Sequence, residues 1–344
     1  MSIWTESLFW RWQVSSSEPF NFQIDYIIEV IRKVQPEMIG LQFPEGFKRR
    51  SPAIASEISE ATGVEIIISA NPCYGACDLD IPILENVDLL FHFGHAQLDD
   101  NRYSDKVIFI ETRSDADVKG VVVKALEELQ GKKVGLLTTV QHVHKLPEVR
   151  EILENNGKVV AIGRGDSKIA YAGQVLGCNF SVADDLDCEE FLYIGSGGFH
   201  PLGVSLATGK RVLIADPFSK DVREVDPSLI MRQRSAAIAK SLDAESFGII
   251  VSSKPGQYRM ELARELKGLA EEKGKTAYIL ILDLITPDQM LQFKVDAFVS
   301  TACPRLAVDE VGRFSAPMLT PQEFEIVLGK REWEDMVFDE IRGD

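Results

Sequence analysis

The sequence predicts an α/β fold of three homologous small domains, each with a mainly parallel four-stranded sheet flanked by helices. One observation is that the same order of elements, a strand, a helix and three further strands, occurs three times along the chain. The other is that these strands consist largely of Val, Ile and Leu, which is typical of strands buried on both faces of a parallel sheet. Right-handed crossovers would connect them. We expect the domains to be arranged around a pseudo-threefold axis and to cover residues 1–115, 116–220 and 221–344.

The first copy begins with the apolar run "MIGLQFPEG", which ends in a Pro-Glu-Gly turn. Apolar residues at helical spacing in "PAIASEISEATG" predict a helix that ends at Gly63, because glycine readily adopts the left-handed conformation that follows a last helical turn. Three strands should follow, in "VEIIISA", "VDLLFHF" and "KVIFIE".

The second copy has the strand "KVGLLTT", a helix through "PEVREILENNG" that ends at Gly157, and the strands "KVVAIG", "FLYIG" and "RVLIAD". The third has "FGIIVSS", a helix through "MELARELKGLAEEKG" that ends at Gly274, and the strands "TAYILILD", "DAFVST" and, with a weaker pattern, "APMLTP". We expect the joins between the domains near residues 113–117 and 217–226.

The composition narrows the class of protein. The chain of 344 residues is 45% hydrophobic and 26% charged, as in globular proteins. Its formal net charge of −16 argues against nonspecific binding to nucleic acid or to anionic membranes, which requires cationic surfaces. No apolar run could span a bilayer, and the start "MSIWTESLFWRWQ" lacks the basic and continuous apolar regions of a signal peptide. We therefore expect a cytoplasmic protein that binds neither nucleic acid nor membrane.

Three of the five cysteines follow predicted strands, one in each domain. Ligands of open α/β sheets bind beyond the carboxyl ends of the strands, and Cys77, Cys178 and Cys303 lie there. If the three domains face one another with these edges, three thiolates converge, which suits an iron–sulfur cluster with one open iron. Cys73 could replace Cys77 or pack beneath the turn, and Cys188 is expected to be a small buried residue. A buried, inert cysteine stays the alternative for each of the others too.

Several motifs resemble one known family. The stretches "YGACD", "GRGDSKIAYAGQVLGC", "GGFHPLG", "SSKPGQ" and "TACPR" are similar to those of the diphthamide biosynthesis radical enzymes, in particular the archaeal homodimeric members. The resemblance extends from the "QFPEG" turn to the "LTPQE" segment. It implies a [4Fe–4S] cluster held by Cys77, Cys178 and Cys303, which selects Cys77 over Cys73. It also implies a homodimer, an electron donor that the sequence does not identify, and translation elongation factor 2 as protein substrate.

The same resemblance implies a reaction. The reduced cluster would pass one electron to the sulfonium of S-adenosylmethionine, and the bond to the methionine γ-carbon would break. The products would be methylthioadenosine and a 3-amino-3-carboxypropyl radical, which would add to C2 of one histidine imidazole. The protein would orient the cofactor, because the carbon that faces the iron decides which bond breaks.

Further residues are candidates for contacts with S-adenosylmethionine. Backbone N–H groups of "SSKPGQ", with Ser252, Ser253 and Gln257, could hold its carboxylate, although a plain Pro-Gly turn is the alternative. Asp283 could accept its ammonium or a ribose hydroxyl, or could simply form a turn. The other candidates are His200 of the "GGFHPLG" block, Gln42 and Glu45 of the "QFPEG" turn, and Arg305, which could pair with a carboxylate or lie on the surface.

The remaining histidines and three rival functions complete the hypotheses. His95 could equally satisfy a core polar group or serve chemistry, and we expect His142 and His144 to be structural or exposed. A rival enzyme is quinolinate synthase, which also has three α/β domains and a cluster with an open iron but does not use S-adenosylmethionine. The non-enzymatic alternatives are an iron–sulfur electron-transfer subunit and a scaffold without a cluster.

Overall fold

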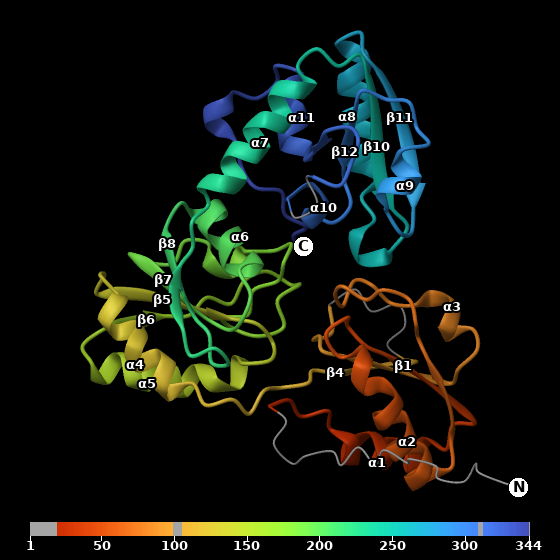
Figure 1. The fold of residues 1–344 in the computed structure, drawn as a ribbon, viewed down its shortest axis with the longest axis vertical. Coiled ribbons are helices and arrows are strands. Elements are labelled where there is room, and N and C mark those ends of the chain that lie inside the picture. Colours follow the sequence, from red (N-terminus) through yellow and green to blue (C-terminus); the bar gives the residue numbers. More distant parts are fainter. Residues whose placement is uncertain (1–18, 99–104, 309–311, 344) are drawn as a thin grey trace, which may run out of the picture.

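The computed structural model describes residues 19–98, 105–308 and 312–343. The stretch "MSIWTESLFWRWQ" lies outside these residues. Three sheets, each with its own helices, form three lobes of the molecule, which we call the first, second and third units (Figure 1). In Figure 1 the first unit is red to orange, the second yellow to green, and the third turquoise to blue. The α/β fold class with three mainly parallel sheets is confirmed.

The first sheet has four parallel strands in the order β2-β1-β3-β4. Its strands are β1 (Met38–Gln42), β2 (Glu65–Ile68), β3 (Leu89–Phe93) and β4 (Val107–Ile110). Its helices are α1 (Ile24–Val34), α2 (Ser51–Thr62) and α3 (Ile81–Leu84). Helix α2 ends where Gly63 adopts a φ of 75°, as predicted, because a residue without a Cβ takes this conformation at little cost.

The second sheet repeats this order and adds one strand that the sequence analysis missed. Its strands are β5 (Lys133–Thr138), β6 (Val159–Ala161), β7 (Glu190–Ile194), β8 (Arg211–Ala215) and β9 (Val222–Glu224), and its helices are α4 (Lys119–Glu128), α5 (Leu146–Asn155) and α6 (Phe199–Thr208). Strands β6-β5-β7-β8 are parallel, whereas β9 pairs antiparallel with β8. The expectation of four strands is therefore wrong for this sheet, which extends into the segment predicted to join two domains.

The third sheet again has the order β11-β10-β12-β13 and is parallel. Its strands are β10 (Ser246–Ser252), β11 (Thr276–Leu282), β12 (Ala297–Ser300) and β13 (Met318–Leu319). Its helices are α7 (Ser228–Ser241), α8 (Met260–Glu272), α9 (Pro287–Met290), α10 (Arg305–Val308) and α11 (Pro321–Val327). Short 3₁₀ helices lie at Lys48–Arg50, Val143–Lys145, Ser181–Ala183, Pro255–Gln257 and Trp333–Asp335. The shared strand order supports three homologous domains, whose exact boundaries stay a prediction.

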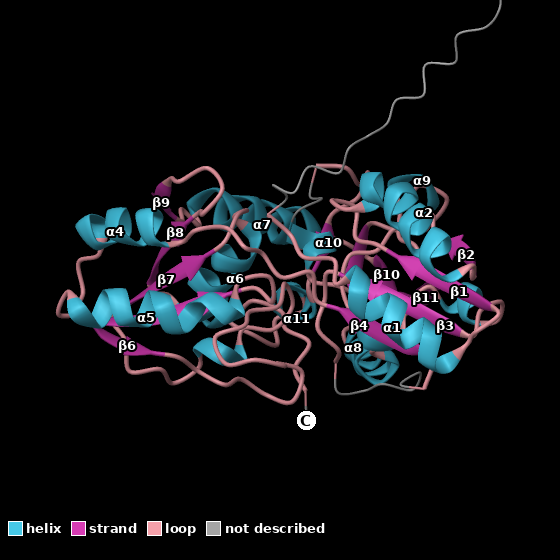
Figure 2. Ribbon diagram, turned by 90° about the horizontal axis from the view of Figure 1, so that it is seen from below, coloured by secondary structure: helices cyan, strands magenta, loops and turns pink. Residues whose placement is uncertain are grey.

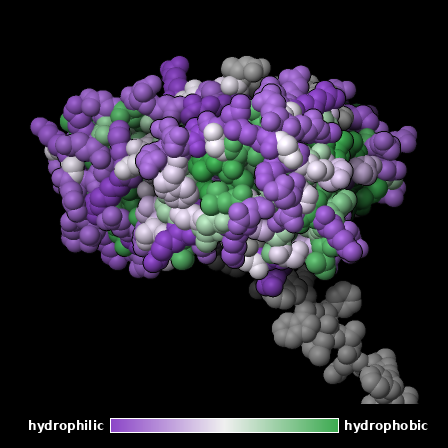
Figure 3. Space-filling view, turned by 90° about the horizontal axis from the view of Figure 1, so that it is seen from above, coloured by the Kyte–Doolittle hydropathy of each residue, from purple (hydrophilic) through white to green (hydrophobic). Residues whose placement is uncertain are grey.

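Helices cover both faces of the sheets, so the cores lie between sheet and helices (Figure 2). The central strands β3, β7 and β12 are buried along their whole length, as their apolar sequences predict. Edge strand β11 differs, because Tyr278 and Ile281 are 56% and 59% exposed. Apolar side chains also reach the surface in patches among hydrophilic ones on the face seen in Figure 3. Within the described ranges no helix is both long and apolar enough to cross a membrane.

Candidate active site

The three predicted cluster ligands lie in loops that follow strands of three different sheets. Cys77 follows β2 in a tight turn, in which Asp78 N–H donates to the carbonyl of Gly75 at 3.0 Å. Cys178 follows β6, and Cys303 lies between β12 and α10. These three thiols are partly exposed, whereas Cys73 and Cys188 are buried, as we expected of those two.

Contacts between the three loops place these cysteines near one another. A Cβ added at Gly177, next to Cys178, would lie 3.6 Å from Cδ of Arg305, two residues after Cys303, and Gln257, which contacts Cys77, lines the same cavity as Cys303. Burial raises the pKa of Cys178, and negative charge on Cys77 and on Cys303 raises that pKa further. Such an effect requires proximity, since charge interactions fall with distance. Three thiols from three sides fit a [4Fe–4S] cluster with one open iron. Their protons would leave when the positive charge of the metal arrives, because the thiolate is the ligand.

The "SSKPGQ" loop of the third unit lies against Cys77. Gln257 donates from Nε2 to Sγ of Cys77 at 3.3 Å. Gly256 is so close that a Cβ added there would lie 2.5 Å from Cβ of Cys77. In the same loop Ser252 is buried and accepts from Lys254 N–H at 3.2 Å, and Ser253 donates to Asp283 at 3.2 Å.

A cavity of about 130 Å³ opens beside Cys303 between the first and third units. Three predicted contact residues line it, Gln257, Asp283 and Arg305, together with Tyr74 and Lys254. Lys254 forms a buried ion pair of 2.6 Å with Asp78, which the sequence analysis did not foresee. A wider groove of about 420 Å³ beside α5 has no cysteine in its lining, so the smaller cavity is the candidate site.

Gln42 begins a chain of side-chain hydrogen bonds under the Cys77 loop. Its Nε2 donates to the carbonyl of Asp78 at 2.7 Å, which leaves Oε1 to accept from Nδ1 of His92 at 2.9 Å. His92 Nε2 can then only accept, and it lies 2.9 Å from Nδ1 of His95. Burial keeps both imidazoles neutral by lowering their pKa values, that of His95 to about 4. The remaining nitrogen of His95, Nε2, is therefore left without a hydrogen.

The sulfur of Cys73 lies 4.0 Å from Nε2 of His92. Ligand atoms of Cys73, His92 and His95 all lie within 4.8 Å of one another, so these residues could hold a metal ion. The hydrogen bond between the two imidazoles would have to be given up for it. The hydrogen-bond chain from Gln42 already accounts for both histidines.

His200 and Arg305 come to the same centre from the second and third units. Burial lowers the pKa of His200 to about 4, and the positive charge of Arg305 acts in the same direction. The guanidinium of Arg305 lies over the ring of Phe199 at 4.2 Å. Each unit thus contributes a cysteine and a second polar side chain: His95 from the first unit, His200 from the second and Arg305 from the third.

Glu45 differs from the other predicted site residues. Its side chain is 53% exposed and pairs with Lys48 at 2.6 Å. Lys48 also donates to the carbonyls of Ala70 and Asn71, at the start of the loop that leads to Cys77. The hydrogen bonds of Lys48 hold the start of the Cys77 loop from its exposed side. A contact of Glu45 with a cofactor stays a prediction.

Fold and site together define a three-domain α/β protein with a candidate three-cysteine metal centre between its domains. Residues 43–337 match the family described as "Putative diphthamide synthesis protein". The chain belongs to this family, as its motifs predicted.

Relatives and solved structures agree with this assignment. The chain is 38% identical over 321 residues to "2-(3-amino-3-carboxypropyl)histidine synthase" of Pyrococcus horikoshii, with 92% of each chain covered. It is 29% identical to the protein of the same name from Methanocaldococcus jannaschii, with 94% of each covered. A crystal structure of Dph2 from Pyrococcus horikoshii with a 4Fe-4S cluster superimposes with a TM-score of 0.87 at 37% identity, covering 94% of this chain and 95% of that one.

Proposed function

We propose that this protein is a radical S-adenosylmethionine enzyme that transfers a 3-amino-3-carboxypropyl group to C2 of a histidine in translation elongation factor 2. This transfer is the first step of diphthamide biosynthesis. The observation that carries the proposal is that the loops of Cys77, Cys178 and Cys303, one from each unit, meet beside a cavity. The relatives are named as synthases of the same modified histidine, which supports it. This name favours the transferase over quinolinate synthase, an electron-transfer subunit or a scaffold.

Cys77, Cys178 and Cys303 would hold the [4Fe–4S] cluster. When bound, the cluster supplies the electron that cleaves the sulfonium of S-adenosylmethionine. Gln257 already donates to the sulfur of Cys77, and such donors stabilise the thiolate form.

The cavity beside Cys303 offers partners for the amino-acid end of S-adenosylmethionine. Arg305 provides N–H groups that match a carboxylate, and Asp283 provides oxygens that match an ammonium. Ser252 ends β10 and Ser253 follows it, and Ser253 orients Asp283 through its hydrogen bond. His200 of the second unit is neutral, so it adds a hydrogen-bond partner for S-adenosylmethionine without adding positive charge. Partners at both ends of the aminocarboxylate would decide which carbon faces the cluster.

Product analysis tests the reaction. Protein reconstituted without oxygen is reduced with dithionite, mixed with S-adenosylmethionine, and the nucleoside product identified by chromatography and mass spectrometry. Methylthioadenosine is expected. 5′-Deoxyadenosine would indicate a conventional radical enzyme, and the absence of any product would count against the proposal. Added elongation factor 2 should gain the mass of the aminocarboxypropyl group, and a variant lacking the target histidine should not.

Cysteine variants test the ligand set. Replacing Cys77, Cys178 or Cys303 with Ala should abolish both iron binding and product formation. Cys188→Ala is the matched control, since Cys188 is buried in the core of the second unit. An active Cys178→Ala protein would refute the three-ligand assignment. The homodimer, the cytoplasmic location and the need for an electron donor belong to the same proposal, and chromatography with light scattering tests the first.

A further inference from the structure

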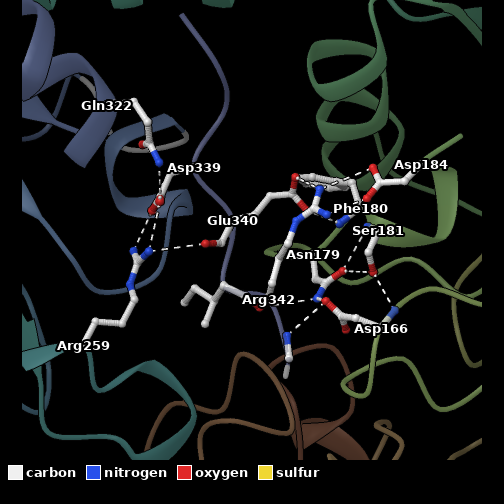
Figure 4. Close-up of polar contacts among 12 residues, drawn as sticks. Asp166, Asn179, Phe180, Ser181, Asp184, Arg259, Gln322, Asp339, Glu340 and Arg342 are labelled. Carbon is white, nitrogen blue, oxygen red and sulfur yellow. Dashed lines mark hydrogen bonds and ion pairs between the residues drawn. The ribbon is translucent and has the colours of Figure 1, made fainter. Parts of the chain in front are cut away.

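The carboxyl-terminal segment 339–343 passes between the second and third units and contacts both (Figure 4). It is inserted between them, since Asp339 is 1% and Ile341 6% exposed. Asp339 accepts from both terminal nitrogens of Arg259, at 3.0 and 2.6 Å, and from Gln322 at 3.1 Å. The segment is thus fixed in the third unit by a bidentate, nearly buried ion pair.

Arg259 connects this segment to the loop of Cys303. Its Nε donates to the carbonyl of Thr301 at 2.6 Å, and its Nη2 to the carbonyl of Ala302 at 3.0 Å. Both residues directly precede Cys303 and are fully buried. Nη1 also donates to the carbonyl of Glu340 at 3.3 Å. One planar guanidinium therefore holds the backbone before Cys303 and the segment 339–343 in one fixed arrangement.

The same segment holds the loop of Cys178. Ile341 N–H donates to the carbonyl of Cys178 itself at 2.7 Å. Next to it, Phe180 N–H donates to the carboxylate of Glu340 at 2.7 Å, and Asn179 donates to the carbonyl of Ile341 at 3.4 Å. The carbonyl of Cys178 and the N–H of Phe180, two residues later, are thus both bonded to the segment 339–343.

Two further contacts fix the segment on the second unit. Asp166 accepts from Gly343 N–H at 3.0 Å and from Asn179 at 2.7 Å. Arg342 pairs with Asp184 at 2.5 Å and with Glu340 at 2.8 Å. Figure 4 shows these contacts on one side of the segment and the Arg259–Asp339 pair on the other.

We propose that residues 339–343 form a strap that sets the separation of Cys178 and Cys303, with Arg259 and Asp339 as positioning residues. Both loops lack regular structure at their cysteine, so their own backbone hydrogen bonds fix them only weakly. The strap supplies partners for both from one continuous piece of chain. Cys77 is held independently, by Gln257 and Gly256. The inference rests on the proposed function only in assuming that Cys178 and Cys303 hold a cluster. The restraint on the two loops follows from the hydrogen bonds and the ion pair described above.

The test uses the full chain with two conservative variants. Asp339→Asn removes the carboxylate charge, and Arg259→Lys replaces the guanidinium fork with one ammonium that cannot serve all its acceptors together. Asp335→Asn is the matched control, four residues earlier in the chain and exposed. The first readout is the rate of alkylation of each of the five cysteines in metal-free protein, determined by mass spectrometry.

We expect alkylation of Cys178 and Cys303 to become about tenfold faster in both variants, because a charge-assisted bond that opposes local opening is lost. Cys77, Cys73 and Cys188 should keep their rates. The second readout is the iron retained, with its visible spectrum, after reconstitution and gel filtration, and we expect it to fall in both variants and not in the control.

Unchanged rates at Cys178 and Cys303 would overturn the strap. So would an equal rise at all five cysteines, which would indicate general loosening, and so would full iron retention despite faster alkylation. If the unaltered protein holds no iron, the proposed function fails, and the alkylation rates alone then decide whether the strap restrains the loops.

Discussion

Gln257 of the third unit donates a hydrogen bond of 3.3 Å to the sulfur of Cys77 in the first unit. Burial raises the pKa of the Cys77 thiol, and this bond opposes the rise because it stabilises the thiolate. Gln257→Ala should therefore raise that pKa further. The measurement is the pH dependence of Cys77 alkylation in metal-free protein, whose midpoint should move to higher pH, with a severalfold lower rate at pH 8.

Gln292→Ala is the control for this change, because Gln292 is an exposed glutamine of the same unit. It should leave the alkylation profile of Cys77 where it is. If Gln257→Ala also leaves it there, the hydrogen bond does not tune this thiol.

The close approach of Gly256 to Cys77 gives a second prediction. A Cβ at residue 256 would lie 2.5 Å from Cβ and 2.9 Å from Cα of Cys77, so no rotation of a side chain relieves the overlap. Gly256→Ala should cost about 1–3 kcal/mol in the free energy of unfolding and lower the iron content after reconstitution. Denaturant titration and iron analysis measure the two effects.

Gly268→Ala serves as its control, since nothing lies within 4 Å of a Cβ at that position in α8. There alanine should stabilise the protein by up to ~1 kcal/mol through its higher helix propensity. Equal stability and iron content of Gly256→Ala and the unaltered protein would contradict the packing described at Cys77.

Much of this fold could be predicted because burial leaves a clear trace in the sequence. The central strands β3, β7 and β12 are buried on both faces, so their residues are mostly apolar and stand out from the helices around them. The position of the cysteines after strands then placed them at one edge of each sheet. Strand β9 was missed because its sequence, "VRE", is partly charged and its residues are half-buried or exposed.

The parts of the site that were not predicted depend on contacts between distant residues. The hydrogen bond from Ile341 to Cys178 joins two backbone groups 163 residues apart, and backbone groups carry no sequence signal. Arg259 and Asp339 are ordinary charged residues until the fold buries them together. The helices α1, α4 and α7 were not identified either, although α1 has apolar residues at helical spacing, such as Ile27 and Ile31, that would have revealed it.

The ion pair between Arg234 of α7 and Glu323 of α11 gives a prediction on stability. Both side chains are 4% exposed, and Arg234 also donates to the carbonyls of Ala307 and Met318. Arg234→Met would leave the carboxylate of Glu323 buried without its partner, which should cost about 3–5 kcal/mol in unfolding free energy.

Adding Glu323→Gln to Arg234→Met should recover part of this loss, because the uncompensated charge is then gone. Equilibrium denaturation of the single and double variants measures the coupling, and strictly additive losses would show that the pair is not coupled.

His142 gives a prediction on pH dependence. It is 2% exposed, and its Nδ1 finds no hydrogen-bond partner among the described residues. Burial lowers the pKa of His142 to about 4, against about 6.5 in an unfolded chain. As the pH falls, the unfolded chain therefore binds this proton first, so the contribution of neutral His142 is fully present above about pH 6.5 and is lost progressively down to about pH 4. Between pH 7 and pH 5 the loss amounts to about 2 kcal/mol.

The variant His142→Leu tests this contribution. When the pH is lowered from 7 to 5, its free energy of unfolding should fall by about 2 kcal/mol less than that of the unaltered protein, as measured by urea titration at both pH values. The exposed neighbour His144 offers the comparison: its pKa is also lowered by burial, but His144→Gln should change the pH dependence less. An equal fall in His142→Leu and the unaltered protein would show that His142 is protonated in the folded state as readily as in the unfolded chain.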